Sequence, residues 1–598
     1  MSSSVPHEGY SRRLDSIAAF TAQCRRQDRF LGVAKLLLAV LIVCLAVWLV
    51  RYHAGKIFYL GIPVVAFIVL AVLHERVSRR LRECVRLETY YNRGIARIEN
   101  RWSGAGETGE RFLDPAHPYA RDLDLFGQGS LFQLVNTART RSGEQMLASW
   151  LLKAASLPEI TARQQAVQAL TPALDFREKL VLAGEEVRVG VHPDQLISWA
   201  ERPHALNRTW IRTATISLAL LWLLSLVAWW QWDWGAAALF MSLVNFGVSY
   251  RFRARIAGAA AGIDGAQQEL LLLSAIFQLI ENEALAAPKL ARLRSALSRS
   301  GATASRAIRQ LSKRVAWYDS HDNWFVKVLD PFVFWTAHCV VAIDAWRARH
   351  GAAIREWLDV SGEVEALSSI AAYAYEHPTD TFPEFTATES GGPCLEAEAL
   401  AHPLLARGSA VPNDLSLNRD LRLLVISGPN MAGKSTFVRA VGINAVLAQA
   451  GAPVCARHLI LSELQVTASI CVLDSLQGGL SRFYAEISRL KQIYELSSRD
   501  IPVLFLLDEL LSGTNSYDRR LGTESFLRSV LARNAIGLVT THDLALAEIA
   551  ERFGPAAANY HFRDTFENGR LHFDYRLMPG IVQTTNALLL MRSIGLDV

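Results

Sequence analysis

Nine consecutive residues combine glycine, lysine and hydroxyl side chains at a spacing suited to binding the phosphates of a nucleotide. They follow the pattern Gly-x-x-x-x-Gly-Lys-Ser/Thr, after the short apolar run 421–426 and before a helical pattern that extends to about Ala450. Glycines let backbone N–H groups converge on phosphate oxygens, and the amino end of the helix adds partial positive charge. We therefore predict a phosphate-binding loop made of Gly428, Pro429, Asn430, Met431, Ala432, Gly433, Lys434, Ser435 and Thr436.

Two side chains of this loop have distinct predicted roles. The Lys434 ammonium would neutralise the β- and γ-phosphate oxygens of a triphosphate, as a catalytic residue. The Ser435 hydroxyl would be a ligand of Mg²⁺. The sequence therefore predicts ATP and Mg²⁺ as cofactors.

Further polar residues follow two buried-strand patterns. Asp508 and Glu509 directly follow the apolar run 503–507. Two threonines separate a second apolar run, 535–539, from His542. A carboxylate at a strand end beside a phosphate loop can hold Mg²⁺, and the next one can polarise an attacking water. We predict Asp508 as a metal ligand, Glu509 as the general base and His542 as a catalytic sensor of the γ-phosphate. A solvated acidic pair and a structural histidine are the alternatives.

The elements that must position these residues alternate short apolar runs with helical patterns, which is typical of a parallel α/β sheet. This alternation begins after the segment 377–412, which is rich in proline and glycine and indicates a boundary. Upstream, residues 74–210 and 251–376 have helical patterns. A length of 598 residues allows about four domains.

Four apolar stretches, 31–50, 57–73, 213–232 and 235–250, stand apart from the rest of the chain. A transmembrane helix needs about 20 apolar residues, with a range of ~17–25. The first three stretches meet this length, and the fourth is short but follows its neighbour after a break at Asp233. We interpret the four stretches as two membrane hairpins. Buried core helices are the alternative.

Basic residues flank both hairpins on the side of the chain termini, and tryptophans gather at the turn of the second hairpin. The positive-inside rule then places both termini and the ATPase domain in the cytoplasm of a multi-pass protein of the inner or cytoplasmic membrane. The first apolar run is interpreted as an anchor rather than a cleaved signal. The flanking residues include Arg25, Arg26, Arg29, Arg76, Arg79, Arg80, Arg208, Arg212, Arg251, Arg253 and Arg255.

Composition excludes several other classes of protein. The net charge is +5, from 62 basic and 57 acidic residues, so bulk charge does not indicate a nucleic-acid binder. The seven cysteines include no Cys-x-x-Cys pair, which argues against a disulfide framework, a zinc ribbon or a dithiol redox centre. Hydrophobic residues make up 51% of the chain, which argues against general disorder.

Several motifs resemble one family. The loop at 428–436 closely resembles the phosphate loop of the MutS family of DNA mismatch-repair ATPases, GPNMGGKST, with Ala432 in place of one glycine. The segment 508–518 looks like the family's DEIGRGTSTYDG, and Thr541-His542 looks like its A-T-H switch. The resemblance covers the chain from about residue 400 to its end.

The segment 479–486 is similar to the family's G-R-S-T-F-x-x-E stretch. In that family the serine reaches the nucleotide of a dimer partner. The resemblance therefore implies a homodimer, with Ser481 as the contact to the partner's nucleotide. A weaker resemblance upstream, at 122–152 and 357–369, is to the family's core or lever domain.

The chain also departs from the family pattern. No mismatch-reading domain or Phe-x-Glu wedge is expected at the N-terminal end, where the first hairpin stands, and no helix-turn-helix dimer module is expected after Val598. The aromatic residue expected to stack on adenine before the phosphate loop is Ala410 or Val411 here. The second hairpin occupies the place of the family's DNA clamp.

The expected fold is therefore multidomain, with helical membrane hairpins, an α-helical lever or core domain, and a C-terminal α/β P-loop NTPase domain of the ABC type. The expected segments are 1–30 (cytoplasmic N-terminal segment), 31–73 (first hairpin), 74–210 (helical, including the MutS-like core start), 211–250 (second hairpin), 251–376 (lever return), 377–412 (boundary) and 413–598 (ATPase domain).

Two functions remain open on the sequence. The first is a membrane-anchored MutS-like ATPase in which ATP binding and hydrolysis at a dimeric site move the lever, with DNA as the effector, related to mismatch repair or to the binding of DNA structures. The alternative is a membrane ATPase switch that couples nucleotide to a protein or lipid partner without DNA. An inactive scaffold is disfavoured, because Lys434, Ser435, Asp508, Glu509 and His542 are all present.

Overall fold

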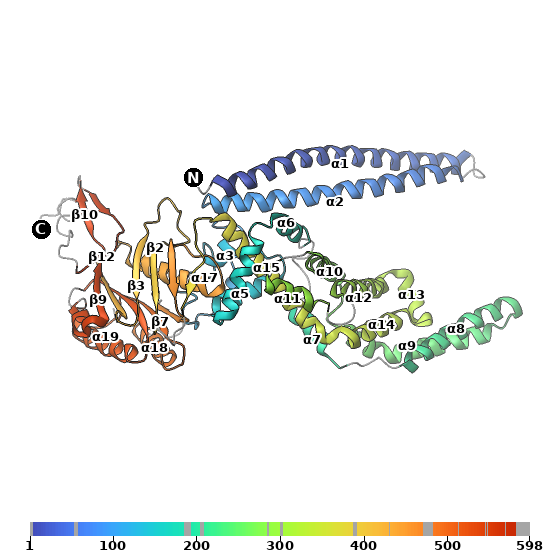
Figure 1. The fold of residues 1–598 in the computed structure, drawn as a ribbon. Coiled ribbons are helices and arrows are strands. Elements are labelled where there is room, and N and C mark those ends of the chain that lie inside the picture. The colour runs from blue at the N-terminus through green and yellow to red at the C-terminus, as the bar shows by residue number, and fades with distance from the viewer. Residues whose placement is uncertain are drawn as a thin grey trace.

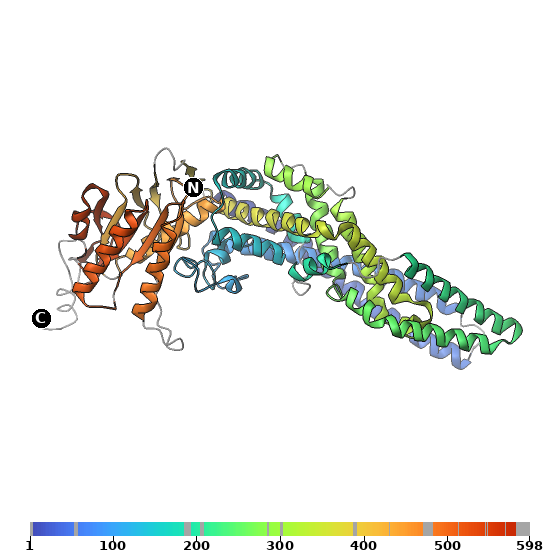
Figure 2. The ribbon, with the colours of Figure 1, turned by 90° about the horizontal axis from the view of Figure 1, so that it is seen from below.

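The computed structural model shows an elongated molecule (Figure 1). An α/β part lies at one end, a stack of helices follows it, and two helical hairpins project away from the α/β part in the same direction (Figures 1 and 2). The structure describes residues 4–52, 58–183, 193–203, 209–283, 286–298, 303–386, 392–429, 431–470, 482–511, 513–543, 546, 548–567 and 570–581.

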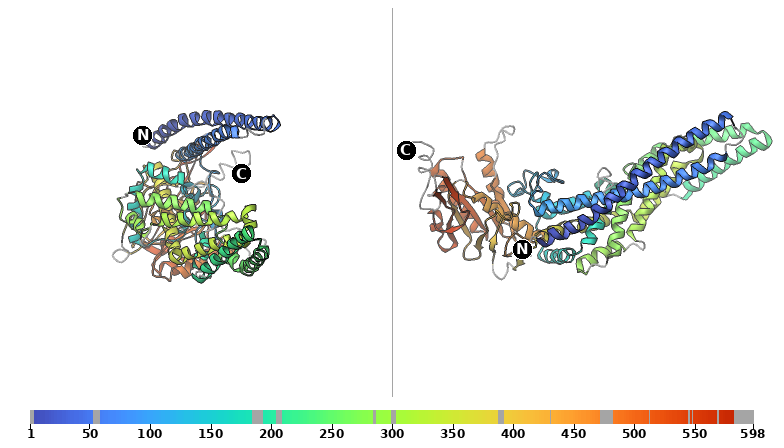
Figure 3. Two further views of the ribbon diagram at one scale, coloured as in Figure 1. Left: turned by 90° about the vertical axis from the view of Figure 1, so that its right-hand side faces the viewer. Right: turned by 90° about the horizontal axis from the view of Figure 1, so that it is seen from above.

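The first hairpin consists of α1 (Ser4–Tyr52) and α2 (Gly61–Ile98), which run along each other (Figure 3). Its distal part carries the two expected apolar stretches, whose side chains are mostly exposed. The one charge in the first stretch is partnered, because the Lys35 Nζ lies 3.0 Å from Nδ1 of His74 on α2. The described residues of the segment 1–30 are helical and continue into the apolar stretch without a break.

A buried ion pair fixes the base of this hairpin to the helical stack. Arg97 of α2 donates two hydrogen bonds of 2.6 Å to the carboxylate of Glu376, at the end of α15 (Ile354–Glu376). Tyr10 of α1 donates a third, of 3.2 Å, to the same carboxylate. Because bidentate arginine–carboxylate pairs define an orientation, the first hairpin is held at the residue where the chain leaves the stack for the α/β part.

Helix α15 is the centre of the helical stack, since it is buried over nearly its whole length. It packs against α4 (Arg141–Leu152) so closely that a Cβ at Gly143 would overlap the side chain of Glu365. The Glu365 carboxylate in turn accepts hydrogen bonds from the backbone N–H and the hydroxyl of Thr140, the residue that caps α4. The other helices of the stack are α3 (Leu131–Val135), α5 (Leu157–Leu170), α6 (Leu174–Ala183), α7 (Pro193–Glu201), α10 (Gln267–Asn282), α11 (Pro288–Ala296), α12 (Ala304–Asp319) and α14 (Trp335–His350), with short 3-10 turns at Glu110–Phe112, Ser320–Asp322 and Gly351–Ala353.

The second hairpin consists of α8 (Thr209–Trp232) and α9 (Gly235–Ala260), with exposed tryptophans at its tip. Among the described residues, three helices are long and apolar enough to cross a membrane, and these are α1, α2 and α8. Helix α9, which contains the expected span 235–250, is not one of them, because polar residues such as Asn245 interrupt its apolar stretch. The Asn245 amide is buried and donates to the backbone carbonyls of Leu218 and Phe332.

A short helix, α13 (Trp324–Val333), lies against both helices of the second hairpin. It is bent by 80° from the helix that follows it, and only together do the two reach the length and hydropathy of a membrane span. The bend falls at Phe334, a residue with φ of 54° that is also buried. One face of α13 is apolar and exposed.

The α/β part contains a six-stranded sheet and a four-stranded sheet. In the larger sheet, of order β12-β9-β4-β8-β7-β6, all pairs except β12 with β9 are parallel. Its strands are β4 (Leu423–Ser427), β6 (Gln465–Ser469), β7 (Val503–Asp508), β8 (Ile536–Thr541), β9 (Ala557–His561) and β12 (Met578–Pro579), and its helices are α17 (Lys434–Ala450), α18 (Arg482–Leu496), α19 (Ser516–Leu531) and the 3-10 segment Glu548–Ala556.

The smaller sheet changes the expected domain boundary. Its order is β1-β5-β2-β3, and its strands are β1 (Glu384–Phe385), β2 (Leu395–Leu400), β3 (Asn413–Leu417) and β5 (His458–Leu461). Two of these strands come from 377–412, so the segment expected as a boundary contributes strands to the α/β part. A separate hairpin is formed by β10 (Asp564–Glu567) and β11 (Arg570–Phe573).

Candidate nucleotide site

Three buried parallel strands end at the same edge of the larger sheet and bring the predicted residues together. Strands β4 and β7 both pair with β8, in a register that sets Ser427 beside Thr541 and Asp508 beside Thr540. The phosphate loop begins one residue after Ser427, and His542 follows Thr541. The strands are buried on both faces, which explains their uninterrupted apolar runs.

The loop after β4 has a backbone that its glycines permit. A Cβ at Gly428 would lie 2.7 Å from the carbonyl oxygen of Phe562, and Gly433 has a φ of 99° directly before α17. Ala432 is buried, whereas Met431 is 85% exposed. Asn430 lies outside the described residues. The loop therefore leads from the strand end into the first turn of a helix, the geometry that the motif predicts.

Lys434, the first residue of α17, folds back into the loop. Its Nζ donates to the carbonyl oxygens of Gly428 at 2.7 Å and Pro429 at 2.9 Å. Burial lowers the pKa of the ammonium, against the opposing effect of the carboxylates of Glu509 and Asp508. The cation is thus held within the loop and near two acidic groups, where a phosphate could replace the carbonyl oxygens as its partner.

The two carboxylates at the end of β7, Asp508 and Glu509, have different partners. Asp508 accepts a hydrogen bond from the Thr540 hydroxyl on the neighbouring strand. The Glu509 Oε1 lies 3.1 Å from Nδ1 of His542, and both side chains are partly exposed. Asp508 is therefore held at the sheet edge, and Glu509 and His542 form one hydrogen-bonded pair open to solvent.

A buried residue of α18 fixes the backbone beyond this pair. The Glu486 carboxylate accepts a hydrogen bond from the backbone N–H of Leu511. Both Glu509 and Leu511 have a positive φ, of 48° and 53°, which is uncommon for residues other than glycine. Glu486 thus holds the loop that presents Glu509, a role not expected from the sequence.

A cavity of about 610 Å³ opens beside the phosphate loop. Ser435, Thr436 and Glu509 line it at the loop, and Ala410 and Val411 line it as well. The size is within the range of small-molecule and cofactor sites. The cavity is therefore large enough for a ligand that extends beyond the phosphates.

An aromatic side chain from a distant part of the chain lies at this cavity, which Ala410 and Val411 also line. Tyr575 lines the same cavity and lies against the loop, since a Cβ at Gly433 would be 3.0 Å from its ring. Asn413 holds this segment by donating to the Tyr575 carbonyl at 3.0 Å and accepting from the Leu577 N–H at 2.7 Å. No local pattern predicts this neighbour, because the contact joins residues more than a hundred positions apart.

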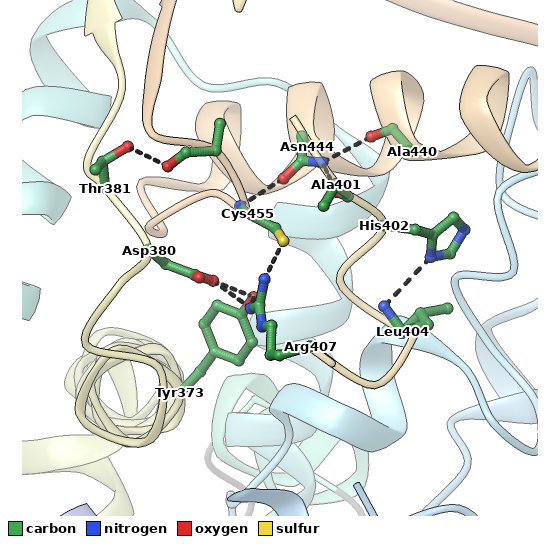
Figure 4. Close-up of polar contacts among 11 residues, drawn as sticks. Tyr373, Asp380, Thr381, Ala401, His402, Leu404, Arg407, Ala440, Asn444 and Cys455 are labelled. Carbon is green, nitrogen blue, oxygen red and sulfur yellow. Dashed lines mark hydrogen bonds and ion pairs between the residues drawn. The ribbon is translucent and has the colours of Figure 1, made fainter. Parts of the chain in front are cut away.

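The wall formed by 401–411 is tied to the helical stack (Figure 4). Arg407 donates to the Asp380 carboxylate at 2.7 Å and to the Tyr373 hydroxyl on α15 at 3.4 Å. It also contacts the Cys455 Sγ, and the Cys455 N–H donates to Asn444 of α17 at 2.7 Å. One polar cluster therefore joins α15, the cavity wall and the helix that carries Lys434.

The titratable groups of this wall are shifted by burial. Burial raises the pKa of Asp380 to about 6, against the opposing effect of Arg407. Burial, with a smaller contribution from Arg439, lowers the pKa of His402 to about 4. The His402 ring is therefore neutral at pH 7, and its Nδ1 accepts a hydrogen bond of 3.3 Å from the Leu404 N–H.

The predicted metal ligands form a sparse site. No group of three or more His, Cys, Asp or Glu residues suited to a metal ion occurs in the part of the chain that the structure describes. Ser435 and Asp508 offer a hydroxyl and a carboxylate, which are oxygen donors of the kind Mg²⁺ prefers. Such a pair fits Mg²⁺, which usually keeps several waters and takes further ligands from substrate phosphates. Ser481, the predicted contact to a partner's nucleotide, lies outside the described residues.

The α/β part of the chain is similar to known proteins. Residues 424–596 match the family model of MutS domain V. The chain is similar to a DNA mismatch repair protein MutS 2 of Halobacterium salinarum, at 34% identity over 39% of this chain and 26% of that protein. It is also similar to DNA mismatch repair proteins MutS of Thermus thermophilus and Thermus caldophilus, at 34% and 32% identity over 39% and 40% of this chain and 28% of each relative. The chain thus spans about a quarter of the length of these curated relatives.

Proposed function

The chain belongs to the MutS family through its C-terminal part, and from this premise we propose that it is an ATP hydrolase whose nucleotide cycle moves the helical stack. The observation that carries the proposal is the meeting of Lys434, Glu509 and His542 at one edge of the sheet, beside a cavity that Ser435 and Tyr575 also line.

In the proposed site, each residue acts on the triphosphate or on the attacking water. Lys434 exchanges its loop carbonyls for phosphate oxygens, and Ser435 and Asp508 would hold Mg²⁺, which neutralises phosphate charge when it is bound. Glu509 accepts the proton of the attacking water, and His542 orients Glu509 through their hydrogen bond. Tyr575 covers the adenine by stacking, in the place that Ala410 and Val411 cannot fill.

The nucleotide cycle is proposed to reach the stack through the polar cluster around Arg407. A ligand in the cavity contacts the wall 401–411, and Arg407 connects this wall to Tyr373 near the end of α15. Three residues further along α15, Glu376 holds the first hairpin through Arg97. A change in the position of the wall would therefore act on α15 and the first hairpin together. A ligand drives such a change only if it binds one of the two conformations more tightly than the other.

Both hairpins are proposed to anchor the protein in a membrane. Large side chains along α1, α2 and α8 are exposed over the length of a bilayer crossing, and Trp230 at the tip of the second hairpin is 87% exposed. Large exposed apolar surfaces mark sites of interaction with a membrane or another protein. Because both tips point away from the α/β part, a single membrane could receive both, with the nucleotide site in the cytoplasm (Figures 1 and 3).

A homodimer of the α/β parts is also proposed. Large apolar side chains are exposed near the site, namely Met431 on the loop, Tyr484 on α18, and Tyr517 and Leu521 on α19. This exposure supports a partner surface facing the phosphate loop, and the family resemblance of 479–486 supports Ser481 as the residue that contacts the partner's nucleotide.

We propose DNA as the effector of the helical stack, on the strength of the names of the relatives, which are DNA mismatch repair proteins. The second candidate, a nucleotide switch acting on a protein or lipid partner without DNA, is favoured by the exposed apolar hairpins. Retention of the detergent-solubilised protein on DNA columns at increasing salt separates the two. Binding no stronger than that of a basic control protein without hairpins contradicts the DNA effector.

The ATPase proposal is tested by turnover of the purified full-length protein with Mg²⁺, with and without duplex, mismatched and branched DNA. We expect ATP hydrolysis that the Glu509→Gln variant lacks, and stimulation by at least one DNA shape if DNA is the effector. Absence of ATP binding at every magnesium concentration contradicts the proposed site as a whole.

A further inference from the structure

A second cavity, of about 370 Å³, lies far from the nucleotide site, where α9 meets α13 and α14. Its walls come from the end of the second hairpin nearest the stack and from the bend between the two helices. Phe246 and Phe334 give it apolar surfaces, and Tyr250, Arg253 and Lys327 give it polar ones. Neither the phosphate chemistry nor the polar cluster of Figure 4 uses this cavity.

The cavity is cationic. In the part of the chain that the structure describes, no carboxylate lies within ion-pair distance of Arg253 or Lys327. The one carboxylate on the cavity wall, that of Asp330, accepts a hydrogen bond of 2.6 Å from the Thr336 N–H at the bend. The His321 ring lies 2.7 Å from the Tyr318 carbonyl through Nδ1. Two basic side chains therefore remain to meet an anion.

A buried hydroxyl also lacks a partner there. The Thr336 Oγ1 is buried and has no hydrogen-bond partner among the described residues, and Thr336 lines the cavity. A buried hydroxyl without a hydrogen bond is unfavourable, so such groups are usually satisfied by a ligand or water. This observation is independent of the two basic residues and points to a polar group bound in the same place.

The position along α9 matches the surface of a membrane that holds the hairpin. From Gly235 at the tip to Arg253 the helix rises about 27 Å, at ~1.5 Å per residue. The hydrocarbon core of a bilayer is ~30 Å thick, so Arg253 falls near the headgroups when the tip lies at the opposite face. Tyr250, one turn closer to the tip, is 73% exposed, as expected for an aromatic residue at the interface.

Helix α13 extends this interface sideways. Its exposed face carries Trp324, Phe325, Val328 and Leu329, whereas Lys327 lies on the face toward the cavity. Ten residues reach only ~15 Å, which is too short to cross the membrane. A short helix with one aromatic face and a basic flank is typical of a helix that lies in the headgroup region.

We propose that this cavity binds the phosphate of an anionic glycerophospholipid, with Arg253 and Lys327 at the phosphate, the Thr336 hydroxyl as a hydrogen-bond donor, and α13 seated in the headgroup layer beside it. The acyl chains leave along the apolar surface around Phe246. The proposal rests on the membrane anchoring proposed above and adds a lipid class and a site to it.

The test is native mass spectrometry of the full-length protein in detergent, titrated with phosphatidylglycerol or phosphatidylcholine. We expect tighter binding of phosphatidylglycerol, and a loss of about 30-fold in the double variant Arg253→Gln/Lys327→Gln, because each basic residue beside an anionic headgroup contributes about fivefold. Thr336→Val should lower the affinity several-fold. The matched control is Arg251→Gln/Arg255→Gln, which removes the same charge from the same region outside the cavity wall and should stay within twofold of the parent.

Equal losses in the two double variants would show surface attraction only and overturn the site. Equal affinity of the parent for glycerol 3-phosphate would overturn the lipid as the ligand. Flotation with phosphatidylcholine vesicles checks the anchoring separately, because a parent protein that floats but does not prefer phosphatidylglycerol overturns the site alone. A parent that does not float overturns both. Unchanged ATP turnover of the double variants in detergent shows that they are folded.

Discussion

Glu509 and His542 directly follow the ends of two neighbouring strands, and a hydrogen bond of 3.1 Å joins the Glu509 carboxylate to the His542 ring. The strand register favours this pairing, because β7 and β8 bring Asp508 beside Thr540 and the Glu509 N–H donates to the Thr540 carbonyl at 3.2 Å. A base held by one hydrogen bond and otherwise open to solvent can accept a proton from water. The protonation state of a histidine in the same hydrogen bond responds to the charge of the base.

Replacing Glu509 by glutamine should separate binding from hydrolysis. The amide keeps the shape of the side chain but cannot take a proton, so ATP should still bind while turnover falls by about 10²–10⁴-fold. Equilibrium binding of labelled ATP and single-turnover phosphate release measure the two effects. The matched control is Glu495→Gln, at an exposed position on α18 paired with Lys491, and it should change neither. Turnover equal to the parent's would refute the assignment of the base.

Replacing Lys434 by alanine should abolish ATP binding with little loss of fold stability. The ammonium is buried, and its lowered pKa indicates that burial disfavours its charged form. Its removal loses two hydrogen bonds to loop carbonyls, which destabilises the fold, but it also removes the unfavourable free energy of burying a charge. The two effects oppose each other. Thermal unfolding without nucleotide and ATP binding by calorimetry test both parts. Lys491→Ala, at an exposed site, is the control for charge.

Tyr575→Ala should raise the KM for ATP by about tenfold and leave kcat nearly unchanged. The ring lies beside the phosphate loop and lines the cavity, so we expect it to stack on the base and to take no part in the reaction at the phosphate. Stacking on an aromatic ring contributes about 1–3 kcal/mol per base. Tyr575→Phe keeps the ring and should behave as the parent. A loss of kcat in both variants would indicate a different role.

Local sequence patterns predict the strands and the helix of the site well. The run before Asp508 and the run before His542 are continuous and apolar because both faces of a parallel sheet are covered. Helix α17 ends at Ala450 because Gly451 adopts a φ of 85°, and the glycine is visible in the sequence. Residues whose roles depend on neighbours along the chain are therefore readable without a structure.

Contacts between distant segments are not readable in this way. Tyr575 and Asn413 meet at the cavity, and Arg407 and Asp380 meet at its wall, although other strands separate each pair along the chain. The sequence pattern does not predict the strands within 377–412, because prolines and glycines interrupt that segment, although the strands are paired at the sheet. Periodicity reports which face is buried, but not which element covers it.

Glu376→Gln should destabilise the attachment of the first hairpin. The change leaves the Arg97 guanidinium buried with a neutral partner, and breaking a buried ion pair costs about 3–5 kcal/mol. We expect hydrogen exchange to increase at the base of α1 and α2, and basal ATP turnover in detergent to persist. The exposed pair of Arg355 and Glu201 offers a control, since Glu201→Gln should have little effect. Exchange that is equal in the two variants would contradict the proposed attachment.

Acidification should destabilise the α/β part through His402. Burial lowers the pKa of this ring to about 4, below its value of ~6.5 in the unfolded chain. Between these values the unfolded state binds a proton that the folded state does not, so the stabilisation is complete above pH ~6.5 and is lost as the pH falls toward 4. The shift corresponds to about 3 kcal/mol at most.

Nearby groups contribute to the same pH dependence, and the variant must isolate His402 from them. Burial lowers the pKa of His377 to about 3, so protonation of His377 also destabilises the folded protein as the pH falls. Burial raises the pKa of Asp380 to about 6, so protonation of Asp380 has the opposite effect and stabilises the folded protein below that pH. His402→Asn keeps an acceptor for the Leu404 N–H but does not titrate. In urea unfolding at pH 7.5 and pH 5, the parent should lose more stability than this variant, by about 2 kcal/mol. Equal losses would show that His402 is not the group whose protonation matters.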